Sequence, residues 1–310
     1  MDHDQRFKTL IREFFADFLR LFFAVWAERF DLEKVEWLDK EVLPNPPEGS
    51  RHLLDLVAKL HAKRPVDEDG ENLLALIHIE IEAPDRTTEL KPRLPSYYVH
   101  LRDEHQLPVL PIVIYLKVKQ DGIGVDVVSE KFWELEVLKF SYLYVGLPGL
   151  DGLEYVKGDS YLGVALSALM KLPTGRIIEL GREAYRKLTE SPLNEQQKHL
   201  LLSCLEDYLP LNERERFEFK RQIENDESPE VRIMAKTFFE DGREKGRQEE
   251  RIEVLRDTIL RQGSKKFGAP TNAVQSQIRS LSDAVQLQEL TVRIIDARTW
   301  DELLQTVCAP

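Results

Sequence analysis

Residues 73–86 read LLALIHIEIEAPDR, and polar and apolar side chains alternate within this stretch. Side chains on a β-strand point alternately to its two faces. His78, Glu80 and Glu82 are therefore expected on one face, and the isoleucine that precedes each of them on the other. The alternation predicts a strand over residues 73–83.

Two carboxylates on one strand face repel each other, and burial makes their charge costly. Glu80 and Glu82 are tolerated in water, beside cationic groups, or around a divalent metal ion. An earlier acid, Asp55, lies in the stretch RHLLDLVAKLH, where a second strand is expected over residues 52–61. An acid on one strand followed by two acids on the next is typical of a magnesium-dependent nuclease site.

Each of these residues also has an ordinary structural interpretation. Glu80 and Glu82 would lie on the solvated face of an antiparallel sheet. Asp55 would belong to a structural ion pair, because an unpaired buried carboxylate is unstable. His78 is interpreted as a hydrogen-bonding neighbour rather than as a ligand. Periodicity alone favours the solvated face for the two glutamates and leaves the role of Asp55 open.

The chain has 310 residues, of which 42% are hydrophobic and 32% charged, as in a globular protein of two or three domains. Its net charge of −12 argues against strong nonspecific binding to nucleic acid. Residues 229–310 carry thirteen basic and thirteen acidic residues, so the acidic excess lies upstream. A nuclease there would need local basic residues, and the candidates are Arg86, Lys91, Arg93 and Arg102.

The cellular compartment is indicated by three features. The two cysteines, Cys204 and Cys308, lack the spacing of a zinc site, so a reducing interior is expected. The first residues, MDHDQRFK, lack the layout of a signal peptide. The run LFFAVWA is shorter than the roughly 20 apolar residues of a membrane span. We therefore expect a cytoplasmic protein with no membrane segment.

Periodicity divides the rest of the chain into a mixed part and a helical part. In the mixed part, we expect helices over 4–30 and 87–105, a turn around Asp69-Gly70, and strands over 34–43, 109–118, 124–128 and 138–145. From about Leu153 the pattern is helical. There we expect a helix over 229–262, ended by Gly263 and by Gly268-Ala269-Pro270, and shorter helices over 272–280, 283–294 and 299–306.

The order of these elements resembles the PD-(D/E)XK nuclease core, a mixed sheet flanked by helices. More narrowly, the chain resembles the Rpn family of recombination-promoting, transposase-like nucleases. The stretches that carry this resemblance are HDQRFKTLIREFF, LLDLVAKL, LIHIEIEAPD, RLPSYYVHLRDEH and LPVLPIVIYL. The tail resembles a small helical domain of unknown function that is often joined to this family, through LRDTILRQGSKKFGAP, IRSLSDAVQLQEL and RTWDELLQ.

The resemblance implies an α/β fold with an all-α C-terminal region. We divide the chain into a nuclease-like core at 1–150, a helical extension at 151–228, a long charged helix or linker at 229–262, and a small helical domain at 263–310.

The resemblance also implies a site for Mg²⁺, with Mn²⁺ as an alternative. Its ligands would be Asp55, Glu80 and the main-chain carbonyl of Ile81. At the third motif position the superfamily prefers lysine and Rpn relatives resemble Glu-x-Gln, whereas this chain has Glu82. A lysine stabilises developing negative charge, and a carboxylate cannot. Glu82 would then be a further ligand, a general base, or a sign of weakened or lost catalysis.

A cation from elsewhere in the chain would make up for the missing lysine. The candidates are Lys59, on the Asp55 face of its strand, and Arg93, on the following helix. Arg93 and Lys91 are also the candidates for contacting the phosphate groups of the substrate.

Three functions follow as expectations. The first is a metal-dependent DNA endonuclease that promotes recombination and acts as a dimer, because cutting two strands favours paired sites. The second is a catalytically silent scaffold with a nuclease fold. The third is a DNA-binding recombination accessory whose affinity depends on salt but not on metal.

Overall fold

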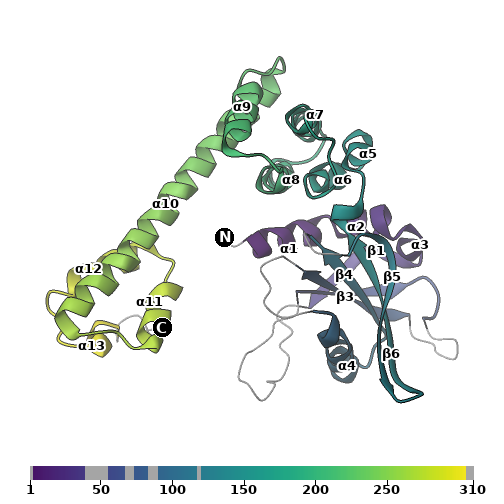
Figure 1. Ribbon diagram of the computed structural model, residues 1–310, viewed down its shortest axis with the longest axis horizontal. Coiled ribbons are helices and arrows are strands. Elements are labelled where there is room, and N and C mark those ends of the chain that lie inside the picture. Colours follow the sequence, from purple (N-terminus) through teal and green to yellow (C-terminus); the bar gives the residue numbers. More distant parts are fainter. Residues whose placement is uncertain (1–2, 39–54, 67–72, 83–89, 117–119, 305–310) are drawn as a thin grey trace. The chain divides into compact units, whose positions relative to one another are not determined.

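The computed structural model describes residues 3–38, 55–66, 73–82, 90–116 and 120–304 (Figure 1). The chain divides into two compact units, residues 1–232 and residues 233–310. The first contains a six-stranded mixed sheet flanked by helices, and the second is helical. The predicted mixed α/β class with a helical C-terminal region is thus confirmed. None of the helices in the described ranges is long and apolar enough to cross a membrane.

The sheet has the strand order β1-β2-β3-β4-β6-β5. Its strands are β1 (Phe30–Leu38), β2 (Leu56–Ala62), β3 (Leu74–Glu82), β4 (Val109–Tyr115), β5 (Gly122–Phe132) and β6 (Leu135–Gly146). Strand β3 pairs antiparallel with β2 and parallel with β4. Strand β4 runs parallel to β6, which forms a hairpin with β5. The strand that follows Asp55 and the strand that carries Glu80 are therefore direct neighbours.

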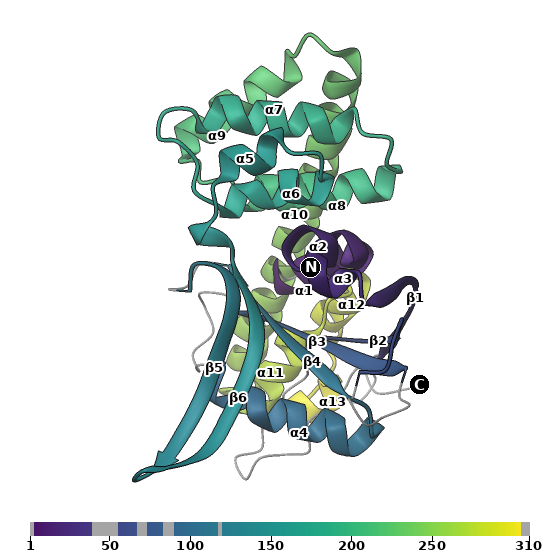
Figure 2. The same cartoon turned by 90° about the vertical axis from the view of Figure 1, so that its right-hand side faces the viewer.

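One face of β3 is apolar, as its alternation predicts. Ile77, Ile79 and Ile81 on this face are each 0% exposed. Phe15 and Trp37 pack edge to face on the same side, with their ring centroids 5.2 Å apart. Figures 1 and 2 show this side covered by α1 (His3–Glu13), α2 (Phe15–Phe22) and α3 (Ala24–Ala27).

The other face of β3 is covered by α4 (Leu94–His105), which follows a short 3₁₀ turn, η1 (Lys91–Arg93). Leu94, Tyr97 and Leu101 of α4 form one apolar cluster with Leu76 of β3 and Val113 of β4. Because side chains alternate along the strand, His78, Glu80 and Glu82 share this face with Leu76. The polar side chains thus lie beneath the N-terminal part of α4, and Glu80 is 1% exposed. The solvated face considered for Glu80 is therefore excluded.

The prediction of one continuous helix over residues 4–30 is wrong. The stretch forms three helices, which are interrupted at Phe14 and Phe23. One straight helix buries only one stripe of its surface. This stretch buries more than one stripe of phenylalanines, namely Phe14, Phe15, Phe18, Phe22 and Phe23. At Phe23 the backbone leaves the helical region, with φ −136° and ψ 47°. The break lets both groups of rings enter the core.

A bundle of helices completes the first unit. It consists of η2 (Leu147–Gly149), α5 (Gly152–Lys157), α6 (Tyr161–Leu166), η3 (Ser167–Leu169), α7 (Ile177–Thr189), α8 (Glu195–Tyr208) and α9 (Glu213–Glu224). Asn194 and Asn212 each begin a helix with a capping box, which satisfies backbone N–H groups at the start of α8 and α9. Helix α1 packs against α8 through an Arg6–Asp207 ion pair of 3.1 Å. The bundle therefore fixes the helix that covers the sheet.

The second unit contains most of α10 (Pro229–Phe267), with α11 (Asn272–Ser280), α12 (Ala284–Arg293) and α13 (Trp300–Leu304). The sequence predicts that Gly263 helps to end the long helix, and this is wrong, because α10 continues to Phe267. Gly263 faces the ring of Trp300, so its lack of a side chain serves packing rather than termination. Gly268, with φ +86°, is the residue that ends the helix.

The turn predicted around Asp69-Gly70, the candidate Arg86 and the second cysteine, Cys308, lie outside the described residues.

Candidate active site

Asp55 and Glu80 meet where β2 begins and β3 ends. Leu56, the first residue of β2, is in register with Ile79, so Asp55 lies beside Glu80. The backbone N–H of Asp55 donates to Glu80 Oε1 at 3.2 Å. In return, the backbone N–H of Ile81 donates to Asp55 Oδ2 at 2.8 Å. These reciprocal hydrogen bonds hold the two carboxylates next to each other on adjoining strands.

The Ile81 carbonyl points to the same place. Leu76 donates its backbone N–H to Pro108, and the Glu82 carbonyl accepts from Leu116, so even-numbered residues of β3 direct their backbone groups toward β4. Since consecutive residues of a strand direct theirs to opposite sides, Ile81 directs its N–H and its carbonyl to the β2 side, where the N–H meets Asp55. The two predicted carboxylate ligands therefore lie together at one end of the sheet, and the Ile81 carbonyl lies on the same side of β3.

Both carboxylate side chains are almost completely buried, each at 2% exposure. Buried carboxylates need compensating contacts, because their charge loses the stabilisation of water. Glu80 receives one such contact from His78, whose Nε2 lies 3.0 Å from Glu80 Oε1 and whose side chain is 1% exposed. The interpretation of His78 as a hydrogen-bonding neighbour agrees with this geometry.

Lys8 provides the corresponding contact for Asp55. Its Nζ lies 2.8 Å from Asp55 Oδ1, and its side chain is 18% exposed. Lys8 is not among the predicted site residues, because the sequence of residues 4–30 indicated only a helix. A usable signal was present, since Lys8 directly follows the buried Phe7 and lies one turn before the buried Ile11. A lysine at the border of a buried helix face covers its aliphatic stem, and its ammonium group can reach a carboxylate in the fold.

His78 is held in turn by α4. The Tyr97 ring meets the His78 ring edge to face, with their centroids 5.9 Å apart. The Arg93 guanidinium lies 5.8 Å from the centre of the Tyr97 ring. Arg93 therefore lies at the start of α4, on the sheet face that carries Glu80. Its contact with a substrate phosphate stays a prediction.

Lys59, the other candidate cation, has a carboxylate partner on β1. Its Nζ lies 3.1 Å from Glu36 Oε2, and the two residues are in register. Lys59 is also in register with Leu76, four residues before Glu80 along β3. Lys59 thus forms its ion pair away from the end of β3 that carries Glu80. Its catalytic role stays a prediction.

Lys91 belongs to a polar network beside the site. Its Nζ lies 2.7 Å from Asp126 Oδ2, and the Tyr142 hydroxyl donates to the same oxygen at 2.6 Å. Burial opposes ionisation of Asp126, but hydrogen bonds from Lys91 and Tyr142 lower its pKa below the ordinary value. The network continues to Tyr115, whose hydroxyl lies 3.1 Å from that of Tyr142.

Glu82 lies at the end of this network. It is in register with Tyr115 and shares the sheet face of Glu80. Burial raises the pKa of the Tyr115 hydroxyl, and the nearby charges of Asp126 and Glu82 raise it further. The structure thus places Glu82 beside Tyr115 and two residues along β3 from Glu80, and its role as ligand or general base stays a prediction.

Within the described ranges, no three His, Cys, Asp or Glu side chains are grouped so that they could hold a metal ion. The predicted set of metal ligands is not such a group of three side chains, because it combines two carboxylates with a main-chain carbonyl. Oxygen donors of this type suit Mg²⁺ or Mn²⁺.

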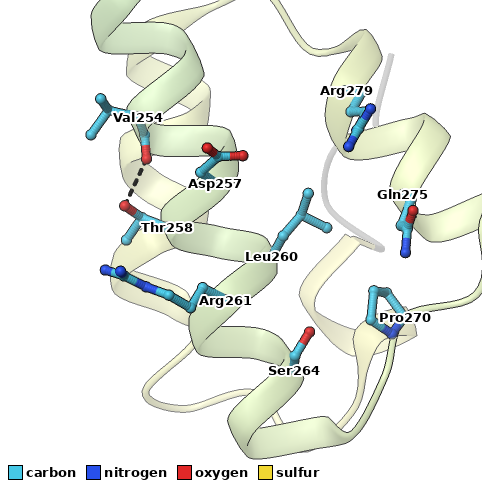
Figure 3. Close-up of a pocket in the computed structure, with 9 residues that line it drawn as sticks. All are labelled: Val254, Asp257, Thr258, Leu260, Arg261, Ser264, Pro270, Gln275 and Arg279. Atoms are coloured by element: carbon cyan, nitrogen blue, oxygen red, sulfur yellow. Dashed lines mark hydrogen bonds between the residues drawn. The ribbon is translucent and has the colours of Figure 1, made fainter.

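An open cavity of about 560 Å³ lies in the second unit, between α10 and the segment that includes Pro270 and α11 (Figure 3). Asp257 is the one carboxylate among the described residues that line it, together with Val254, Thr258, Leu260, Arg261, Ser264, Pro270, Gln275 and Arg279. The Thr258 hydroxyl is engaged with the Val254 carbonyl at 2.6 Å. The Thr258 hydroxyl therefore contacts a backbone carbonyl rather than an acid or base. The hydrogen bonds that join Asp55 to Glu80 and Ile81 make the strand-end carboxylates the candidate active site.

Comparison with known proteins does not identify a relative, since no family model, curated protein or solved structure matches the chain.

Proposed function

We propose that the protein is a metal-dependent DNA endonuclease with a PD-(D/E)XK core of the Rpn type. The observation that supports this proposal is the pair of reciprocal hydrogen bonds between Asp55 and the Glu80–Ile81 segment. They bring two buried carboxylates and a directed carbonyl to the ends of adjoining strands. A solvated sheet face or a simple ion pair does not require that arrangement.

The donor set fits Mg²⁺ or Mn²⁺, with Asp55, Glu80 and the Ile81 carbonyl as the ligands. Such an ion, when bound, neutralises phosphate charge and lowers the pKa of a bound water. The protein contributes rigidity, because Ile79 and Ile81 are fixed in the core and keep the oxygen atoms at strand ends. Arg93 is the candidate for holding the substrate phosphate close to the site.

The test is cleavage of supercoiled DNA with Mg²⁺ or Mn²⁺ by the parent and by the variants Asp55→Ala and Glu80→Ala. We expect the parent to nick DNA and each variant to lose roughly 100-fold or more of that rate, because each lacks a ligand. Glu130→Ala, which removes an exposed acid from β5, is the matched control and should cleave like the parent. Equal cleavage by all four proteins, or none by the parent with either metal, contradicts the proposal.

A second candidate function is the catalytically silent scaffold. It is favoured by the Lys8–Asp55 ion pair of 2.8 Å, which neutralises Asp55 without a metal, and by Glu82 at the position where a lysine is expected. Calorimetric titration with Mn²⁺ and Mg²⁺ separates the two functions. Stoichiometric binding that Asp55→Ala abolishes counts against the scaffold, whereas salt-sensitive DNA binding without metal dependence would indicate a DNA-binding accessory protein.

A further inference from the structure

We propose that Lys8 supplies the positive charge which the nuclease pattern places at the third motif position, where this chain has Glu82. The inference rests on the proposed endonuclease function and names a residue of the same site. Lys8 lies on α1, outside the strands that carry the acids.

The position of the Lys8 ammonium is the first observation. Its Nζ is 2.8 Å from Asp55 Oδ1, while the other oxygen of that carboxylate accepts the Ile81 N–H. The Lys8 side chain is 18% exposed, so its stem is largely covered and its head reaches the strand end. A phosphate group bound beside Asp55 would lie within reach of this ammonium after a small movement of the flexible side chain.

The packing of α1 against α8 is the second observation. Arg6 pairs with Asp207 of α8 at 3.1 Å, and the Phe7 ring meets the Tyr208 ring with centroids 6.1 Å apart. These contacts come from the two residues that precede Lys8. The helical bundle therefore holds the helix that presents the ammonium, which reduces the cost of organising the site during the reaction.

The other basic candidates have partners elsewhere. Lys59 pairs with Glu36, Lys91 pairs with Asp126, and Arg93 lies over the Tyr97 ring. Lys8, in contrast, pairs directly with Asp55, one of the proposed ligands, at 2.8 Å. Its position also explains how a glutamate can occupy residue 82, because the required charge then comes from a helix rather than from β3.

The chemical role is electrostatic. In the hydrolysis, a water oxygen bonds to phosphorus and the bond from phosphorus to one sugar oxygen breaks. The water loses one proton to solvent, and the departing sugar oxygen takes one up. Lys8 keeps its protons throughout and stabilises the negative charge on the phosphate oxygens in the transition state.

The experiment measures cleavage and Mn²⁺ affinity in the full chain for the parent, Lys8→Met, Lys8→Gln and Lys8→Arg. We expect the two neutral variants to lose roughly 100-fold of the cleavage rate, and Lys8→Arg to retain part of it. Mn²⁺ affinity in the neutral variants should stay within about threefold of the parent or become tighter, because a competing cation leaves Asp55. Arg12→Met, which removes a basic residue of the same helix that lies over Trp37, is the control and should cleave like the parent.

Two results overturn the inference while leaving the endonuclease intact. One is a neutral Lys8 variant that cleaves like the parent although Asp55→Ala is inactive. The other is a cleavage loss matched by an equal loss of Mn²⁺ affinity, which would make Lys8 a purely structural residue. The variants Lys8→Met and Lys8→Gln are compared so that a folding defect in one still leaves the other to decide. A parent that neither cleaves DNA nor binds Mn²⁺ through Asp55 overturns both proposals together.

Discussion

Gly263→Val is expected to destabilise the helical unit of residues 233–310 by about 3 kcal/mol. A Cβ atom at this position would lie 2.2 Å from the Trp300 ring, far inside contact distance. The ring cannot easily move away, because Trp300 is 8% exposed and its indole N–H donates to the Gly268 carbonyl at 3.0 Å. The Phe267 ring also packs against it, with centroids 5.3 Å apart. Steric overlap therefore outweighs the helix-propensity gain of roughly 0.5 kcal/mol from replacing glycine with valine.

Hydrogen exchange measured peptide by peptide in the full chain would locate this effect, which should appear as faster exchange across α11–α13. Gln262→Ala changes the exposed residue beside Gly263 and should leave exchange unchanged. In a double-mutant cycle, Trp300→Leu should recover part of the loss caused by Gly263→Val, with a coupling of about 1 kcal/mol or more. If Gly263→Val and the parent exchange hydrogens at the same rate across α11–α13, the glycine and the indole ring are not in contact.

Glu206→Gln is expected to stabilise the first unit by up to about 3 kcal/mol at pH 8 and to have little effect near pH 4. Burial on α8 raises the pKa of the Glu206 carboxyl to about 7, although Lys220 and Arg216 partly oppose the shift. Its Oε1 is buried and accepts no hydrogen bond from any residue that the structure describes. The charge of Glu206 also adds to the effect of burial in raising the pKa of the Tyr185 hydroxyl.

The direction of the pH dependence follows from proton linkage. A carboxyl whose pKa is higher in the folded state binds its proton more tightly there, so folding is favoured while the group is protonated. The stability that this proton gives is complete below the ordinary value of 4.5 and is lost as pH rises to about 7. Urea unfolding of the parent and the variant from pH 4 to pH 8 measures the difference. Glu195→Gln, at an 80% exposed side chain of the same helix, is the control, and parallel curves for the parent and Glu206→Gln would contradict the assignment.

The sheet was largely predictable because strand alternation is a local property. The apolar face formed by Ile77, Ile79 and Ile81 and the meeting of Asp55 with Glu80 both follow from a period of two and from neighbouring strands. The outer part of the β5–β6 hairpin was less predictable. Its tip is exposed, with Trp133 at 83%, so burial imposes no alternation there and the strands run beyond the expected limits.

The partner of Asp55 could not be predicted from spacing. Lys8 belongs to a helix that packs against the distant α8, with the Arg6–Asp207 ion pair as one of the contacts. That contact is a tertiary one. The helix pattern places Lys8 at the border of a buried face but does not specify which carboxylate it meets. The interruption at Phe23 has the same origin, since it results from packing rings into a core and not from a helix-breaking residue. The dimer, the DNA substrate and the cytoplasmic location stay predictions.

The placement of Trp300 has a practical consequence for spectroscopy. Of the four tryptophans in the chain, it alone belongs to residues 233–310, while Trp26, Trp37 and Trp133 lie upstream. An indole shielded from water emits at shorter wavelength than one in solvent. With the three upstream indoles replaced by phenylalanine, the colour of the remaining fluorescence would report melting of the C-terminal helices separately from melting of the part that carries Asp55.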